Sequence, residues 1–205
     1  ASHLLEPNLP PLPDRLSQLG HLCARFGAQA INWRFDPICF YRCQGQCTGN
    51  NLDDFTQIAS QAAQYGIRRC ITSFRDDYRK IQKRTAQIKG FDFEDPPLQT
   101  KVDLLLEMEK LLRAVQIDLM VCCEKEVLAH LPGTSTITRS SCIPNDLLVR
   151  LFGGGLPMQK DAGQRRQAGC GCFVSKDVGS YERHPCYHNC LFCYANQSCD
   201  GQTPS

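Results

Sequence analysis

Apolar side chains in the first three quarters of the chain alternate between helical and strand-like spacing. After Asp14, leucines recur every three or four residues up to Gly27, which is the pattern of an amphipathic helix that ends at a glycine. Residues 30–35 form a short apolar run that predicts a buried strand, stopped by Asp36-Pro37. The same alternation continues, and it predicts helices over 52–65, 100–115 and 145–152 and strands over 67–74 and 117–122.

The order strand, helix, strand, helix, strand predicts parallel strands joined by right-handed crossovers, which makes the fold class α/β. Thr100 and Asp103 suit a capping box at the start of the third helix. Residues 1–13 are rich in proline and are expected to be irregular. Residues 75–99 are highly charged and then interrupted by two prolines, which predicts a long connection. Three strands are too few to close a barrel, so only part of a sheet is expected.

Fourteen cysteines among 205 residues are the outlying feature of the composition. They cluster in C-x2-C, C-x3-C and C-x-C groups, and Cys122 and Cys123 are adjacent. Clusters of this kind favour metal binding in a reducing compartment over a disulfide framework, so a cytoplasmic location is predicted. A net charge of +2 gives no electrostatic indication of a nucleic-acid partner, and no apolar run is long enough to span a membrane.

The strongest chemical signal lies near the C-terminus, where Cys186, Cys190 and Cys193 follow a C-x3-C-x2-C spacing. Thiolates at this spacing can close one turn of backbone around a soft metal centre, either an iron–sulfur cluster or zinc. We therefore expect the three sulfurs to converge. Cys170 and Cys172, just upstream, are additional candidates, because a Cys-Gly-Cys pair cannot close on itself without strain.

The spacing, with an aromatic residue before the last cysteine, is similar to the motif by which radical S-adenosylmethionine (SAM) enzymes hold a four-iron cluster on three thiolates. Residues 164–196 resemble the C-terminal signature of the domain-of-unknown-function 1848 family. Counterparts of that family pattern also occur around Trp33, Ser73, Cys122 and Cys142. The resemblance covers most of the chain, and it implies a radical-SAM-like cluster, a barrel-like layout and an N-terminal part that this chain lacks.

Together these observations predict an α/β protein with two parts. Residues 1–156 are expected to form a partial (β/α) barrel-like parallel sheet. Residues 157–205 are expected to form a C-terminal cysteine-rich metal-binding module.

Polar residues follow each predicted strand and are candidates for a binding site. Arg34 and Asp36 end the first strand, Asp76 and Tyr78 follow the second, and Glu124 follows the third. Ligands bind at the carboxyl ends of the strands in parallel α/β sheets, so these side chains should face one mouth. The alternative for Arg34 and Asp36 is a structural ion pair, and Asp36-Pro37 can equally be a turn.

Further cysteines allow more than one interpretation. Cys39, Cys43 and Cys47 form a C-x3-C-x3-C series after the first strand, which we interpret as ordinary loop thiols or one disulfide, with a second metal site as the alternative. Cys142 is either a distant metal ligand or a buried residue.

The sequence therefore predicts an iron–sulfur protein that resembles radical SAM enzymes, with an unknown substrate at the mouth and an electron donor as partner. The resemblance implies a [4Fe-4S] cluster on the C-terminal triad and SAM on its open iron. Two alternatives remain at this point. A fourth thiolate from Cys170 or Cys172 would close the cluster and leave an electron-transfer or structural protein, and zinc on the same thiolates would make an interaction module.

Overall fold

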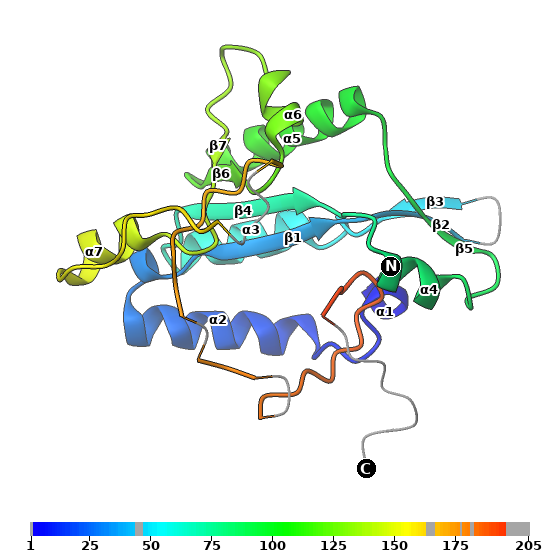
Figure 1. Ribbon diagram of the computed structural model, residues 1–205, viewed down its shortest axis with the longest axis horizontal. Helices are drawn as coiled ribbons and strands as arrows, with labels where there is room; N and C mark the ends of the chain where they lie inside the picture. Colours follow the sequence, from blue (N-terminus) through cyan, green and yellow to red (C-terminus); the bar gives the residue numbers. More distant parts are fainter. Residues whose placement is uncertain (1, 44–46, 163–166, 177, 181–182, 196–205) are drawn as a thin grey trace.

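Four parallel strands form the central sheet, in the order β1-β4-β6-β7 (Figure 1). The computed structural model describes residues 2–43, 47–162, 167–176, 178–180 and 183–195. The strands are β1 (Trp33–Ile38), β4 (Arg69–Phe74), β6 (Asp118–Val121) and β7 (Thr138–Arg139). Neighbouring strands pair in parallel, so the predicted α/β arrangement is confirmed, and β7 extends it by one strand that the sequence did not indicate.

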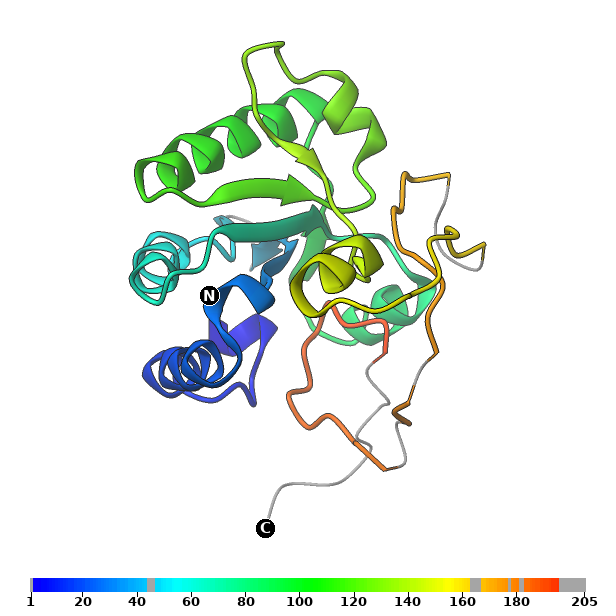
Figure 2. The same ribbon diagram turned by 90° about the vertical axis from the view of Figure 1, so that its left-hand side faces the viewer.

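Three helices cover one face of this sheet, and they lie along the same side of it in Figure 2. They are α2 (Leu12–Phe26), α3 (Phe55–Gln64) and α5 (Leu98–Ala114). Leu105 and Leu112 of α5 are completely buried, and they belong to one core with Trp33, Cys70 and Leu119 from the strands. This apolar layer is the main hydrophobic core, and burial of its surface is the largest favourable contribution to folding.

The opposite face of the sheet carries polar side chains. Trp33 and Phe35 pack in or against the main core. Because side chains alternate between the faces of a strand, Arg34 and Asp36 point to the other side. That side is occupied by helix α7 (Asn145–Phe152) and by the C-terminal segment (Figure 2).

A second, antiparallel sheet lies beyond the carboxyl ends of β1 and β4 (Figure 1). It has the order β3-β2-β5 and consists of β2 (Phe40–Cys43), β3 (Cys47–Asn50) and β5 (Phe91–Glu94). The sequence predicted only loops here. The strands are four residues long, and β5 together with helix α4 (Arg79–Thr85) lies inside the stretch that we expected to be one long connection.

Two predicted boundaries are wrong. The first strand does not stop at Asp36-Pro37, because β1 continues to Ile38 across a register shift between Phe35 and Ile38 that accommodates the missing proline N–H. The capping box is also absent, because α5 begins at Leu98 after Pro97, which places Thr100 and Asp103 inside the helix without a side-chain cap.

The remaining short elements complete the chain. They are α1 (Ser2–Leu5), the 3-10 helix η1 (Ala28–Ala30) and α6 (Lys125–Ala129). The predicted helix ends at Gly27 and Gly66 are confirmed, and both glycines have a positive φ, 82° and 84°. In the part of the chain that the structure describes, no helix combines the length and the apolar character needed to cross a membrane.

Candidate functional site

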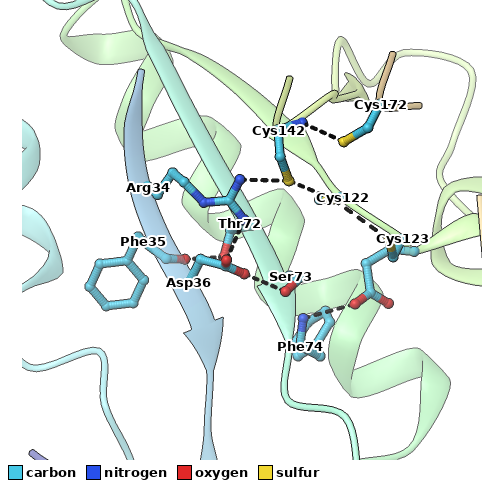
Figure 3. A network of polar contacts seen from close by, with 11 residues as sticks. Arg34, Phe35, Asp36, Thr72, Ser73, Phe74, Cys122, Cys123, Cys142 and Cys172 are labelled. Atoms are coloured by element: carbon cyan, nitrogen blue, oxygen red, sulfur yellow. Dashed lines mark hydrogen bonds and ion pairs between the residues drawn. The ribbon is translucent and has the colours of Figure 1, made fainter. Parts of the chain in front are cut away.

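Arg34 and Asp36 form an ion pair on the polar face of β1. Residues two positions apart in a strand point to the same side, which brings the guanidinium to the carboxylate. Ser73 Oγ donates to the other carboxylate oxygen of Asp36, and Thr72 Oγ1 donates to the carbonyl of Phe35 at 2.6 Å (Figure 3). The ion pair considered from the sequence is therefore present, and it is tied to the neighbouring strand.

Four cysteines meet where β6 and β7 end (Figure 3). Cys122 Sγ lies 3.5 Å from Cys142 Sγ and 3.6 Å from Cys123 Sγ. The backbone N–H of Cys142 donates to Cys172 Sγ at 3.2 Å. Arg34 Nη1 donates to Cys142 Sγ at 2.8 Å, so this sulfur cluster is continuous with the ion pair on β1.

Negative charge in the sulfur cluster is concentrated on Cys142. The hydrogen bond with the Cys122 thiol, together with the Arg34 guanidinium, lowers the pKa of Cys142 to about 5, although desolvation acts in the opposite direction. The same hydrogen bond and burial raise the pKa of Cys122. Cys142 is therefore a thiolate at neutral pH, with Cys122 as its S–H donor.

The C-terminal cysteine motif forms a turn that packs against the N-terminal helix. The N–H of Leu191 donates to the carbonyl of Leu5 at 2.8 Å, and the N–H of Cys193 donates to the carbonyl of Cys190 at 3.2 Å. Leu5 and Leu191 are buried with Cys39 in a small second core. Two segments from opposite ends of the sequence are thereby held together.

Arg84, on α4, holds the backbone of this turn. Its Nη1 lies 3.1 Å from the Cys190 carbonyl oxygen, 2.9 Å from that of Leu191 and 3.1 Å from that of Cys193. A cation that binds three carbonyls of one turn fixes the turn and complements the negative ends of its peptide dipoles. The segment from Cys190 to Cys193 is therefore anchored through its main chain.

The three thiols of the motif differ in exposure. Cys186 is exposed, whereas Cys190 and Cys193 are half-buried. Burial raises the pKa of Cys190 to about 12, and the carboxylate of Glu6 and the thiols of Cys193 and Cys186 act in the same direction.

A cavity of about 470 Å³ opens beside the motif and the ion pair. Its walls include Arg34 and Asp36 from β1, Glu6 and Arg15 from the N-terminal segment, and Phe192 from within the cysteine motif. The volume lies within the range of roughly 300–1,000 Å³ that is typical of small-molecule sites. Burial raises the pKa of Glu6, while Arg15 and His188 act to lower it.

A model of the protein family described as a domain of unknown function, DUF1848, matches residues 1–195. The chain belongs to this family. The DUF1848 match spans both the parallel sheet and the C-terminal cysteine motif, so the two are parts of one family unit. No curated protein and no solved structure shows a significant match.

In this DUF1848 chain, the other predicted mouth residues take separate places. Glu124 Oε1 accepts the Phe74 N–H at 2.8 Å, and Glu124 lines a second cavity of about 740 Å³ together with Cys123 and Gln167. Tyr78 stacks at a tilt on Tyr194, with 5.2 Å between the ring centroids, and so contacts the residue after the last motif cysteine. The predicted candidates are thus divided between two cavities and the C-terminal segment.

Asp76 lies just beyond the end of β4, at the predicted position. It is exposed, and its carbonyl accepts the Tyr78 N–H at 3.2 Å. Asp36, Asp76 and Glu124 therefore lie at the carboxyl ends of three parallel strands, as expected, but they do not line one cavity.

The motif can be tested for its fit to a metal centre. The donor type fits, because Cys190 and Cys193 are soft thiols on the turn that Arg84 anchors and Cys186 precedes it by four residues. Among the described residues, however, no group of three or more His, Cys, Asp or Glu side chains already stands in a metal-holding arrangement. Cys172 contacts the Cys142 backbone, so its thiol belongs to the sulfur cluster beside β6. Cys186, Cys190 and Cys193 therefore have the donor type of a thiophilic centre, but their side chains do not stand in its arrangement.

The C-x3-C-x3-C series begins at Cys39, between β1 and β2, and continues onto the small sheet. Cys39 is fully buried beside Leu5 and Leu191, and burial raises its pKa. Cys43 is half-buried on β2, and its Cα is paired with that of Cys47 on β3. The interpretation of Cys39 and Cys43 as ordinary thiols is consistent with these positions.

Two residues of the site were not identified from the sequence. Glu6 lies in the stretch that was expected to be irregular, and Arg84 lies in the stretch expected to be a loop. Neither residue lies in a sequence motif that would mark it as part of a site. Only the positive charge of residues 79–84 in an otherwise unassigned segment could have drawn attention to Arg84.

Proposed function

We propose that this DUF1848 protein is an iron–sulfur protein of the radical-SAM-like kind, in which Cys186, Cys190 and Cys193 hold a [4Fe-4S] cluster. The observation that carries the proposal is the position of the motif. Its turn is anchored by Arg84, and Phe192 of the motif forms a wall of the 470 Å³ cavity that also exposes the Arg34–Asp36 ion pair. Redox chemistry at the thiolates would therefore take place beside a small-molecule cavity.

Cys186, Cys190 and Cys193 would hold the cluster, which would supply one-electron reduction of SAM when both groups are bound. The residues of the chain have simpler tasks. Arg34 and Asp36 supply paired charge for orienting a polar substrate, and Phe192 excludes water from the side of the cavity nearest the thiols. The substrate is an unidentified small molecule, and an external electron donor is required.

The layout supports a barrel-like interpretation of the fold. Parallel strands follow one another in chain order and helices cover one face (Figure 2). The Arg34–Asp36 ion pair lies on the other face, as polar side chains do in a section of a (β/α) barrel (Figure 3). We propose that residues 1–156 form this section, that residues 157–205 form the cluster-binding module, and that the protein works in the cytoplasm.

Anaerobic purification with iron, sulfide and zinc analysis tests the cluster. We expect about four irons and four sulfides per chain, and less than one iron in a Cys186→Ala, Cys190→Ala, Cys193→Ala variant. The matched control is Cys43→Ala, which removes a half-buried thiol outside the motif and should keep the iron. Zinc without sulfide in the parent protein would overturn the iron–sulfur proposal in favour of an interaction module.

Electron paramagnetic resonance of the reduced protein, with and without SAM, tests the open iron. Binding of SAM changes the ligand field of that iron, so the spectrum should change at saturating SAM. A spectrum that does not change at saturating SAM would indicate a closed cluster in an electron-transfer or structural protein. In that case a Cys170→Ala, Cys172→Ala variant that gains the response would identify the fourth thiolate.

A further inference from the structure

The sulfur cluster beside β6 contains a pair of thiols that the proposed iron–sulfur centre does not use. Cys122 directly follows β6, and Cys142 lies just beyond β7, the neighbouring strand. Their sulfurs are 3.5 Å apart (Figure 3). A disulfide brings two sulfurs to about 2 Å, so a small side-chain movement would join them.

The two thiols differ in their exposure to solvent. Cys142 is exposed, whereas Cys122 is only 3% exposed. Arg34 places a guanidinium nitrogen 2.8 Å from Cys142 Sγ, which stabilises negative charge on that sulfur. An exposed, cation-paired thiol beside a buried second thiol is the arrangement of an attacking and a resolving cysteine.

We propose that Cys142 and Cys122 are a redox-active dithiol that exchanges with disulfide bonds of an incoming molecule. Cys142 is the attacking thiolate, Cys122 is the resolving thiol, and Arg34 is the positioning residue. The oxidant belongs to the class of exposed disulfides, either small or within a protein.

The exchange balances in two steps. The Cys142 thiolate attacks one sulfur of R–S–S–R′, the S–S bond breaks, and R′–S⁻ leaves, which gives a Cys142–S–S–R mixed disulfide. The Cys122 thiol gives its proton to the departing R′–S⁻, and its sulfur then attacks Cys142 Sγ and expels R–S⁻, which takes the proton originally lost from Cys142. The products are a Cys122–Cys142 disulfide, R–SH and R′–SH, so two electrons pass from the protein to the incoming disulfide.

The charge distribution supports this order of events. The hydrogen bond with Cys122 and the Arg34 guanidinium lower the pKa of Cys142 to about 5, whereas the pKa of Cys122 is raised. Cys142 is therefore ready to attack at neutral pH, and Cys122 stays protonated until the mixed disulfide has formed.

Cys123 is the competing partner, because its sulfur lies 3.6 Å from that of Cys122. A disulfide between adjacent residues closes a strained ring, and it would leave Cys142 without a resolving thiol. Joining Cys122 to Cys142 instead links the ends of two paired strands.

The test uses the whole chain, purified anaerobically without chelators, and glutathione disulfide as the probe. After alkylation of the remaining thiols, trypsin releases Cys142 on residues 140–150 and Cys122 with Cys123 on residues 114–125. Mass spectrometry should detect these two peptides linked. A Cys123→Ser variant should give the same link, whereas loss of the link in that variant would overturn the assignment of Cys122.

A Cys122→Ala variant should accumulate glutathione on the 140–150 peptide, because the mixed disulfide can no longer be resolved. A Cys142→Ser variant should incorporate no glutathione at the 114–125 peptide. If glutathione appears there instead, Cys142 is not the attacking residue and the proposal fails.

The pH profile tests the role of Arg34. At pH 6, alkylation of Cys142 should be roughly tenfold faster than that of an ordinary exposed thiol, since its larger thiolate fraction outweighs its lower nucleophilicity. Arg34→Met should shift the midpoint of the profile to higher pH, while Arg34→Lys should shift it less. A midpoint that does not move with Arg34→Met would remove Arg34 from the mechanism.

Metal analysis separates this proposal from the iron–sulfur centre. A Cys122→Ser, Cys142→Ser variant should retain the metal content of the parent protein, and its failure to exchange says nothing about the C-terminal triad. Loss of metal in this variant would show that the pair ligates a metal, which would overturn the dithiol proposal.

Discussion

Two arginines join segments that are far apart in the sequence. Arg34 contacts Asp36 two residues away and Cys142, which follows the strand at the opposite edge of the sheet. Arg84 contacts the turn at Cys190, more than a hundred residues later. Spacing marked the cysteines themselves as candidates, because metal-ligand motifs are local. It could not mark Arg84, because its partners are brought to it only by the fold.

Removal of the Arg84 side chain should loosen the cysteine turn. Arg84→Met deletes the hydrogen bonds to three carbonyls, and we expect the free energy of local opening to fall by roughly 1–3 kcal/mol. Amide hydrogen exchange at Leu191, whose N–H donates to Leu5, measures this opening. Lys83→Met is the matched control on an exposed position of the same helix. Equal exchange rates in both variants would show that Arg84 does not anchor the turn.

Glu109 predicts a pH dependence of stability. It is 7% exposed, and it accepts hydrogen bonds from the N–H and Oγ1 of Thr136 at 2.5 and 2.7 Å and from Ser135 Oγ at 3.1 Å. Burial acts to raise its pKa, but these hydrogen bonds outweigh burial and lower it. A carboxylate with a depressed pKa in the folded state stabilises the protein above its unfolded pKa of roughly 4.3, and this contribution is lost as the pH falls through the folded pKa.

Glu109→Gln should therefore lower the free energy of unfolding by roughly 1–2 kcal/mol at pH 7, and the difference from the parent should shrink below about pH 4. Urea unfolding of the variant and the parent at pH 7 and below about pH 4 measures this difference in the free energy of unfolding. Glu107→Gln, exposed on the same helix, is the control and should have little effect. A difference that persists undiminished at low pH would contradict the assigned ionisation.

At the scale of elements, long segments with regular apolar spacing were predicted correctly, whereas short strands were missed. The amphipathic helices and three parallel strands were predicted from their apolar spacing, and their ends at Gly27 and Gly66 followed from glycine chemistry. The small sheet was missed because its four-residue strands carry no clear alternation, and pairing of β5 with β2 joins residues about fifty positions apart. β1 continues past Pro37 because a register shift, invisible in sequence, removes the need for the proline N–H.

Helix α5 allows a direct test of which helix face is in the core. Leu112 is completely buried, whereas the adjacent Leu111 is 45% exposed. Leu112→Ala should reduce the free energy of unfolding by about 2–5 kcal/mol, because it removes buried methyl groups and leaves a cavity. Leu111→Ala should cost no more than about 0.5–1 kcal/mol. Similar costs for the two changes in urea unfolding would contradict the orientation of α5.

At the scale of the whole molecule, one face of the central sheet carries the hydrophobic core and the other carries the candidate reactive groups. Helices α2, α3 and α5 bury the main core on one face, while the ion pair and the sulfur cluster lie on the other (Figures 2 and 3). The C-terminal segment adds few apolar residues, chiefly Leu191 and Phe192, to the small second core. A segment with so little buried surface depends on hydrogen bonds and on any metal that its thiolates hold.

On the proposed cluster assignment, removal of iron should therefore release the C-terminal segment without unfolding the core. Arg183 is exposed just before the motif, and a cluster on Cys186, Cys190 and Cys193 would tie down the chain that follows it. We expect trypsin to cleave after Arg183 at least several times faster once an anaerobic chelator has removed the iron, since three metal–thiolate bonds no longer oppose local opening. Cleavage after Lys89, exposed in the turn before β5, should keep its rate, because the main core is independent of the metal. Mass spectrometry of timed digests gives both rates. Equal acceleration at both positions would mean that the core depends on the metal, and no acceleration at Arg183 would mean that the thiolates of the motif do not hold it.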